Sequence, residues 1–219
     1  MPTMLPTLRT DTPLLYVAPL SGYAYKVALA LRLLGMPHAL RTVDLSVPRA
    51  QRPQAFRTVA RFDEVPVLLI DGLALCQSNA ILEYLARRQS ALHEGDESQR
   101  LKVREWLAWE GEQIGLNLAH ACSARQFGRH PSAVVEWYDA RVAANLARLA
   151  QVLEDRPFLV GELPTVADVA CYAWLPYARA QGLFEPLPPA VAAWVARIAA
   201  LPGYSDPETI FAGAAPCAD

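Results

Sequence analysis

Two short motifs in the first half of the chain place polar side chains directly before predicted helices. Ser21 follows Pro19-Leu20 and precedes a helical pattern, and Gln77-Ser78 precedes another. A hydroxyl at a helix N-terminus lies beside exposed N–H groups and the positive end of the helix dipole, which favour an anion. The amide of Gln77 adds donors and an acceptor suited to a zwitterion. A plain helix N-cap is the alternative interpretation of each motif taken alone.

A third motif, Val65-Pro66, opens a predicted strand. A proline at the start of a strand can have a cis peptide bond, which would turn the preceding backbone N–H and C=O outward. Those groups could then pair with an extended ligand. An ordinary proline at the edge of a strand is the alternative.

A fourth motif lies in the second half, where Thr165 and Asp168 precede an apolar run. Their Thr-x-x-Asp spacing is that of a capping box, in which each residue satisfies a backbone N–H of the other. This motif concerns folding, and its removal would cost roughly 1 kcal/mol or more.

The elements that must position the first three motifs alternate between strand and helix. The sequence pattern predicts the order β-α-β-α-β-β-α, in which Asp71-Gly72 forms a hairpin turn and the arginine-rich stretch 49–62 could form one helix. The predicted strands are 14–17, 38–45, 65–70 and 73–75, and the clearer helices are 22–34 and 79–88.

A polar linker, residues 89–99, separates this α/β half from a second half in which no strand is predicted. Helical patterns cover residues 99–127, 132–154, 165–180 and 188–200. The sequence therefore predicts an α/β domain over residues 12–89 and an all-α domain over residues 98–219.

Composition narrows the class of protein. The chain has 219 residues, of which 53% are hydrophobic and 19% are charged, as in packed globular proteins. A net charge of −2 argues against a nucleic-acid binder that works through bulk positive charge. No apolar stretch approaches the roughly 18 residues of a membrane span, and the N-terminus lacks a secretory pattern. Dispersed cysteines and histidines suggest no metal site, so a reduced cytoplasmic protein without a structural metal is expected.

The order of these motifs resembles the cytosolic glutathione S-transferases. The resemblance rests on Ser21-Gly22-x-x-Tyr25-Lys26-Val27, Glu64-Val65-Pro66-Val67-Leu68, Gln77-Ser78-Asn79-Ala80-Ile81-Leu82-x-Tyr84-Leu85 and residues 161–168, and it spans about residues 14–200. It implies a thioredoxin-like N-terminal domain that binds glutathione, followed by a C-terminal helical bundle that shapes an electrophile pocket. It also implies a homodimer.

The resemblance assigns Ser21 to the position where the serine-type classes (theta, zeta and many bacterial forms) stabilise the glutathione thiolate. It implies that the backbone of Val65 pairs with the cysteinyl part of glutathione and that Pro66 is cis. Gln77 and Ser78 would hold the γ-glutamyl group. Each unit by which the thiol pKa is lowered requires about 1.4 kcal/mol of preferential thiolate stabilisation.

The segment before Val65 departs from the family pattern: many members read Asn-Pro-x-Gly-Lys/Gln there, whereas this chain has Ala60-Arg61-Phe62-Asp63-Glu64. Related proteins often carry lysine or glutamine at the position of Glu64, where it helps to bind glutathione, whereas a glutamate would repel the glycyl carboxylate. Arg52, Arg57 or Arg61 could compensate through a guanidinium–carboxylate pair.

The electrophile pocket is expected at the turn after the first strand, along the long helix after the linker and near the C-terminus. The candidates are Tyr23, Trp109, Gln113, Asn117 and Phe211. A core role is the alternative for Trp109, and His120 on the same helix fits a structural role better than a catalytic one. Tyr16 and Cys76 are expected in the core.

These observations predict a glutathione transferase that joins the glutathione thiolate to a small hydrophobic electrophile, with no metal. A binding or regulatory protein of the same fold is one alternative, favoured by Glu64 and opposed by Ser21 and Gln77-Ser78. A glutathione-dependent isomerase or disulfide reductase is another. The isomerase fits less well because Gly22-Tyr23 follows the serine where such relatives carry Ser-Cys.

Overall fold

The computed structural model describes residues 12–92, 95–128 and 130–218 and divides into two compact units. The first unit runs to Leu85 and resumes at Ser205, and the second comprises Ala86–Tyr204. The sequence placed residues 205–219 in the helical domain, whereas contacts group this last segment with the α/β unit. The chain therefore passes between the two units twice.

The first unit is built on a mixed sheet with the strand order β4-β3-β1-β2-β5. β1 is parallel to β2 and antiparallel to β3, and β3 and β4 form the predicted hairpin. Asp71 and Gly72 both have positive φ, as a type I′ turn requires. The strands are β1 (Leu14–Val17), β2 (Ala39–Thr42), β3 (Val67–Ile70), β4 (Leu73–Cys76) and β5 (Ala215–Pro216).

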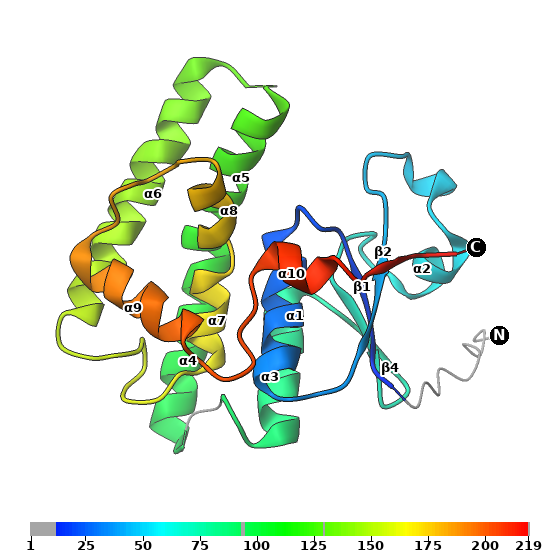
Figure 1. Cartoon of the computed structure of the whole chain (residues 1–219), viewed down its shortest axis with the longest axis horizontal. Helices are drawn as coiled ribbons and strands as arrows, with labels where there is room; N and C mark the ends of the chain where they lie inside the picture. Colours follow the sequence, from blue (N-terminus) through cyan, green and yellow to red (C-terminus); the bar gives the residue numbers. More distant parts are fainter. Residues whose placement is uncertain (1–11, 93–94, 129, 219) are drawn as a thin grey trace. The chain divides into compact units, whose positions relative to one another are not determined.

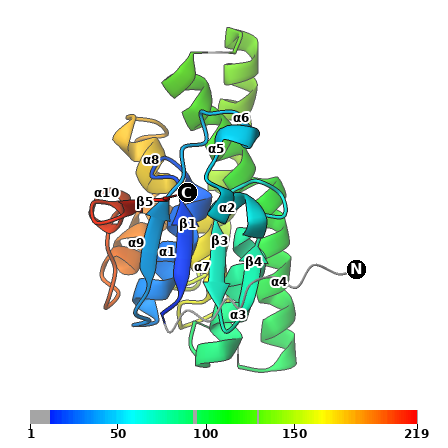
Figure 2. The same ribbon diagram turned by 90° about the vertical axis from the view of Figure 1, so that its right-hand side faces the viewer.

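Helices cover both faces of this sheet. Figure 1 shows α1 (Gly22–Leu33) and α3 (Ser78–Gln89) on one side and α2 (Gln54–Val59) on the other, and Figure 2 views the sheet from the α2 side. One 3₁₀ turn (Arg49–Gln51) precedes α2. Tyr16 is 4% exposed and its ring meets Phe56 of α2 edge-on at 5.6 Å, so its predicted place in the core is confirmed.

The last segment completes the first unit. α10 (Pro207–Phe211) packs against α1, and β5 pairs in parallel with β2. The hydroxyl of Tyr25 donates to the Ser205 carbonyl at 2.9 Å, and the Cys217 N–H donates to the Thr42 carbonyl at 2.9 Å. The prediction of no strand after the linker was wrong because β5 has only two residues, both exposed, and so carries no alternating pattern.

The second unit contains six helices within its described residues: α4 (Glu97–Glu112), α5 (Ile114–Phe127), α6 (Ser132–Leu153), α7 (Val166–Tyr172), α8 (Leu175–Ala180) and α9 (Pro189–Ala199). Two long predicted helices are each divided. The 165–180 pattern breaks before α8, where Pro176 lacks the N–H that would continue the helix. The 99–127 pattern breaks at Gln113, whose φ and ψ are −114° and −93°.

The capping box predicted at Thr165 and Asp168 is present at the start of α7. Asp168 is fully buried and accepts from the N–H groups of Leu159 and Thr165 and from Trp194 Nε1, each at 2.9 Å. Burial raises the pKa of the Asp168 carboxyl, and these hydrogen bonds oppose that shift. One carboxylate thus joins α7, α9 and the preceding loop.

The break between α4 and α5 lies beside a buried carboxylate. Glu110 is 0% exposed, and a Cβ added at Gly115 would overlap its Oε1 atom. The carboxylate therefore occupies the space next to the first turn of α5, where the helix dipole favours a negative charge. Only glycine leaves this space open.

Gly115→Ala is expected to destabilise the protein by about 2 kcal/mol, because the Cβ overpacks the site of Glu110. Helix propensity alone predicts that the substitution stabilises the protein, since alanine is favoured over glycine in a helix by about 1 kcal/mol. Urea unfolding gives the free-energy change directly. Gly213→Ala is the control because its Cβ meets nothing within 4 Å. A Gly115→Ala protein that is more stable than the wild type would contradict the conclusion that Glu110 fills the space beside Gly115.

Candidate functional site

Ser21 is the N-cap of α1, as the sequence indicated. Its backbone is extended, and its Oγ accepts a hydrogen bond from the Ala24 N–H at 3.2 Å. A serine hydroxyl offers one donor and two acceptor lone pairs. Among the described residues, the Ser21 hydroxyl donates to no acceptor. Its proton is therefore available at the positive end of α1.

The Val65-Pro66 peptide bond is cis, as predicted. Both residues are buried, and β3 begins at Val67, next to Tyr16 of β1. Within the described part of the chain, neither the N–H nor the C=O of Val65 forms a backbone hydrogen bond. These two groups can pair with the backbone of an extended ligand.

Gln77 forms the one-residue connection between β4 and α3. Its φ of +69° is uncommon for a residue with a side chain, and such backbone conformations concentrate at functional sites. Its Nε2 donates to Glu64 Oε2 at 3.2 Å, so the structure brings Glu64 and Gln77 together. Ser78 follows as the first residue of α3 and is 8% exposed.

Arg52 lies between the 3₁₀ turn and α2. Its Nη1 donates to the Asp63 carbonyl at 2.6 Å and its Nη2 to the Leu45 carbonyl at 3.3 Å. Arg57 and Arg61 are exposed, and in the described residues neither contacts Glu64. Arg52 therefore links the segments before and after α2, and the neighbour of the Glu64 carboxylate is the Gln77 amide.

Lys26 is a buried basic residue near Ser21 and Gln77 to which the sequence analysis gave no role. It is 0% exposed, and its Nζ donates to Asn79 Oδ1 at 2.9 Å and lies 5.2 Å from the ring centroid of Tyr23. This contact joins α1 to α3, the helices that begin beside Ser21 and Gln77. A lysine within the apolar run of α1 was the available signal.

The five residues expected to line the electrophile pocket divide between the units. Tyr23 and Phe211 belong to the first unit, where Phe211 is 7% exposed in α10. In the second unit, the Trp109 ring packs edge-on against Trp106 at 5.2 Å, while Gln113 and Asn117 contact Arg141. Their membership of one pocket stays a prediction.

Arg141, on α6, was not predicted. Its Nε donates to Asn117 Oδ1 at 3.2 Å, its Nη2 donates to Gln113 Oε1 at 3.0 Å, and its guanidinium lies 4.8 Å from the ring centroid of Trp137. Gln113 and Asn117 thus position a cation. The only sign of this role in the sequence is an arginine at one of the half-buried positions of α6.

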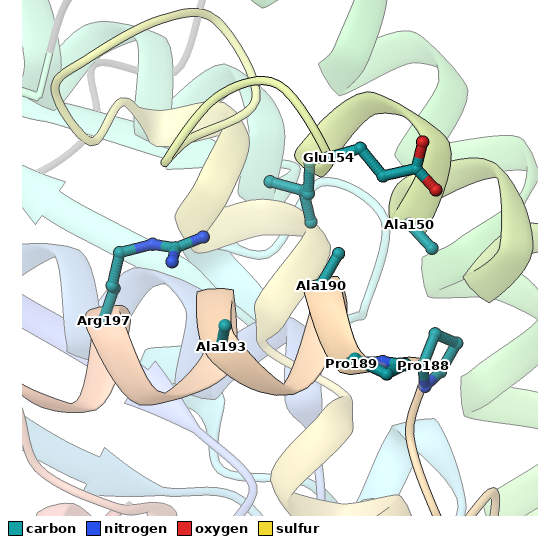
Figure 3. Close-up of a pocket in the computed structure, with 8 residues that line it drawn as sticks. Ala150, Glu154, Pro188, Pro189, Ala190, Ala193 and Arg197 are labelled. Carbon is teal, nitrogen blue, oxygen red and sulfur yellow. The ribbon is translucent and has the colours of Figure 1, made fainter.

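A separate groove of about 500 Å³ lies between the end of α6 and the start of α9 (Figure 3). Its lining is mostly alanine and proline, and Figure 3 shows the Glu154 side chain directed away from Arg197. The Nε of Arg197 donates to the Pro157 carbonyl at 2.9 Å. The groove contains none of the predicted site residues.

No cluster of three or more His, Cys, Asp or Glu side chains suited to a metal ion occurs in residues 12–92, 95–128 and 130–218. In the same ranges, no helix has both the length and the apolar character needed to cross a membrane. The four cysteines are free, and Cys76, which was expected in the core, is the last residue of β4 and is half-buried.

Comparison with known proteins identifies the family of this chain. The profile described as the glutathione S-transferase N-terminal domain matches residues 15–94, and that of the C-terminal domain matches residues 124–197. The chain is 31% identical to human glutathione S-transferase theta-2B over 182 residues, which cover 77% of this chain and 73% of the relative. The chain belongs to the glutathione S-transferase family.

Other members of this family are comparably similar. The disulfide-bond oxidoreductase YfcG of Escherichia coli K12 is 29% identical over 199 residues, which cover 86% of this chain and 90% of YfcG. A glutathione S-transferase structure from Xanthobacter autotrophicus superposes with a TM-score of 0.79 at 31% identity, covering 89% of this chain and 96% of that one. The predicted fold, a thioredoxin-like domain followed by a helical domain, is therefore confirmed.

Proposed function

We propose that this glutathione S-transferase family member is a serine-type transferase, in which Ser21 stabilises the glutathione thiolate for attack on a small electrophile. The observation that carries the proposal is the Ser21 hydroxyl, which accepts from Ala24 and keeps its proton for a ligand. Because this proton lies at the N-terminus of α1, hydrogen bonding and the helix dipole both favour a thiolate over a thiol.

The remainder of glutathione would lie along the first unit. The N–H and C=O of Val65 would pair with the cysteinyl backbone, which the absence of internal backbone partners for Val65 in the described residues supports. Gln77, Ser78 and the N-terminus of α3 would bind the γ-glutamyl carboxylate. The buried Lys26 adds a positive charge between α1 and α3.

The reaction needs little beyond this arrangement. The thiolate sulfur attacks an electrophilic carbon, a carbon–sulfur bond forms, and the leaving group departs with the bonding electron pair. The protein contributes by raising the fraction of thiolate and by holding the two reactants together. Cytoplasmic location and a homodimer complete the proposal as expectations of the family.

Ser21→Ala is expected to lower kcat at neutral pH about ten- to a hundredfold, because the thiol pKa returns upward by one to two units. The KM for glutathione should change much less, since the hydroxyl acts on the sulfur. The kcat–pH profile should shift to higher pH by the same amount. Ser21→Thr, which keeps a hydroxyl, is the matched control for loss of the helix cap. Equal rates for Ser21→Ala and the wild type would exclude Ser21 as the activating group.

Glu64→Gln is expected to tighten glutathione binding about two- to fivefold, because it removes an exposed negative charge that would repel the glycyl carboxylate. The new amide oxygen can still accept from Gln77 Nε2, so the local geometry is retained. Calorimetric titration of glutathione at neutral pH measures the change. Glu162→Gln, an exposed site in the second unit, controls for net charge. Unchanged affinity would show that the Glu64 carboxylate does not repel the ligand.

Disulfide reduction is a second candidate, favoured by the similarity to YfcG along 90% of that protein. The bound thiolate would attack a disulfide, release one thiolate and form a mixed disulfide, which a second glutathione would resolve to give oxidised glutathione. Both thiols come from glutathione, so no protein cysteine is consumed.

The two reactions separate in one pair of assays. We expect a larger kcat/KM for the conjugation of 1-chloro-2,4-dinitrobenzene than for the reduction of hydroxyethyl disulfide. The second reaction is followed by coupling it to glutathione reductase and NADPH. Cys76→Ser should leave both rates unchanged, because the Cys76 thiol contacts the Val59 carbonyl and takes no part in either step. A larger kcat/KM for the disulfide would make reduction the function. Glutathione binding without either reaction would favour a binding protein.

A further inference from the structure

Arg141 is held in place by two amide side chains on α5. Asn117 is 1% exposed and accepts from Nε, while Gln113 accepts from Nη2. Asn117 is itself fixed, because its Nδ2 donates to the Gln113 carbonyl at 2.6 Å. The guanidinium therefore has a defined position in the second unit, and three of its five N–H groups remain for a ligand.

The charge of Arg141 is not neutralised within the part of the chain that the structure describes. The nearest acidic residue in sequence, Asp139, is bound to Arg125 at 2.5 Å, and Arg141 makes no ion pair. Arg141 is half-buried, and both of its hydrogen-bond partners are neutral amides. A partly desolvated guanidinium without a counter-ion favours an anion, particularly a carboxylate that matches its planar donors.

An aromatic surface adjoins this cation. The Arg141 guanidinium lies over the Trp137 ring, and Trp137 is 54% exposed, so part of its ring is open to a ligand. Tyr138 meets Trp137 edge-on at 5.0 Å, and His120 is stacked on Tyr138 at 4.8 Å. The cluster therefore offers one cation and an exposed aromatic ring side by side.

We propose that Arg141 and Trp137 bind an aromatic carboxylate, with the carboxylate on the guanidinium and the arene against the indole. Identification of this ligand as the electrophile that receives glutathione rests on the proposed transferase function. The binding itself does not, because every residue in the cluster belongs to the helical unit.

The test compares two aryl halides that differ in charge, 4-chloro-3-nitrobenzoate and 4-chloro-3-nitrobenzamide. Calorimetry without glutathione is expected to give about tenfold tighter binding for the benzoate, as a charge-assisted hydrogen bond provides. Arg141→Gln should abolish this preference, and Arg141→Lys should retain part of it. Arg148→Gln, an exposed site on the same helix with the same change in charge, should leave the preference intact.

Equal affinity for the two compounds, or a preference that survives Arg141→Gln, would overturn the proposal. A lower melting temperature for Arg141→Gln with no preference in the wild type would likewise overturn it and leave Arg141 a link between helices. With glutathione present, we divide the kcat/KM of each compound by the rate constant of its uncatalysed reaction with glutathione. This ratio should also be higher for the benzoate than for the benzamide. Preferential binding of the benzoate without turnover of either compound would refute the transferase function while the site stands.

Discussion

The fully buried ammonium of Lys26 requires hydrogen-bond acceptors, and the Asn79 Oδ1 atom supplies one at 2.9 Å. Loss of a partner from a buried charge is strongly destabilising, so the ammonium ties α1 and α3 together. Ser21 lies five residues before Lys26, and Gln77 lies two residues before Asn79. The two helix N-termini thus keep a fixed spacing, which a ligand that spans both requires.

The local parts of this arrangement could be predicted from the sequence because their causes are local. Ser21 caps the helix that follows it, and the Asp71-Gly72 turn defines the hairpin. The cap and the turn each depend on neighbours within a few residues. The cis bond before Pro66 was instead implied by the resemblance to the glutathione S-transferases, since Val65-Pro66 alone also fits an ordinary proline at the edge of a strand.

The parts that could not be predicted depend on contacts between distant residues. The Glu64–Gln77 hydrogen bond joins residues 13 positions apart, and the Arg141–Gln113 bond joins residues 28 apart. The interruption at Gln113 was missed for another reason: helical periodicity continues through it, although the buried Glu110 carboxylate fills the space beside Gly115 at the start of α5. Helical spacing grouped Gln113 with Asn117, but it could not show that both contact Arg141 on α6.

The return of the chain to the first unit has a consequence for its synthesis. The helical unit is an insertion within the α/β unit, because the sheet takes its fifth strand from residues after Tyr204. An N-terminal fragment that ends at residue 89 would present β2 as an open edge able to pair with another chain. On the ribosome, this edge stays uncovered while the entire helical unit is translated. The α/β unit begins to fold first and is completed last.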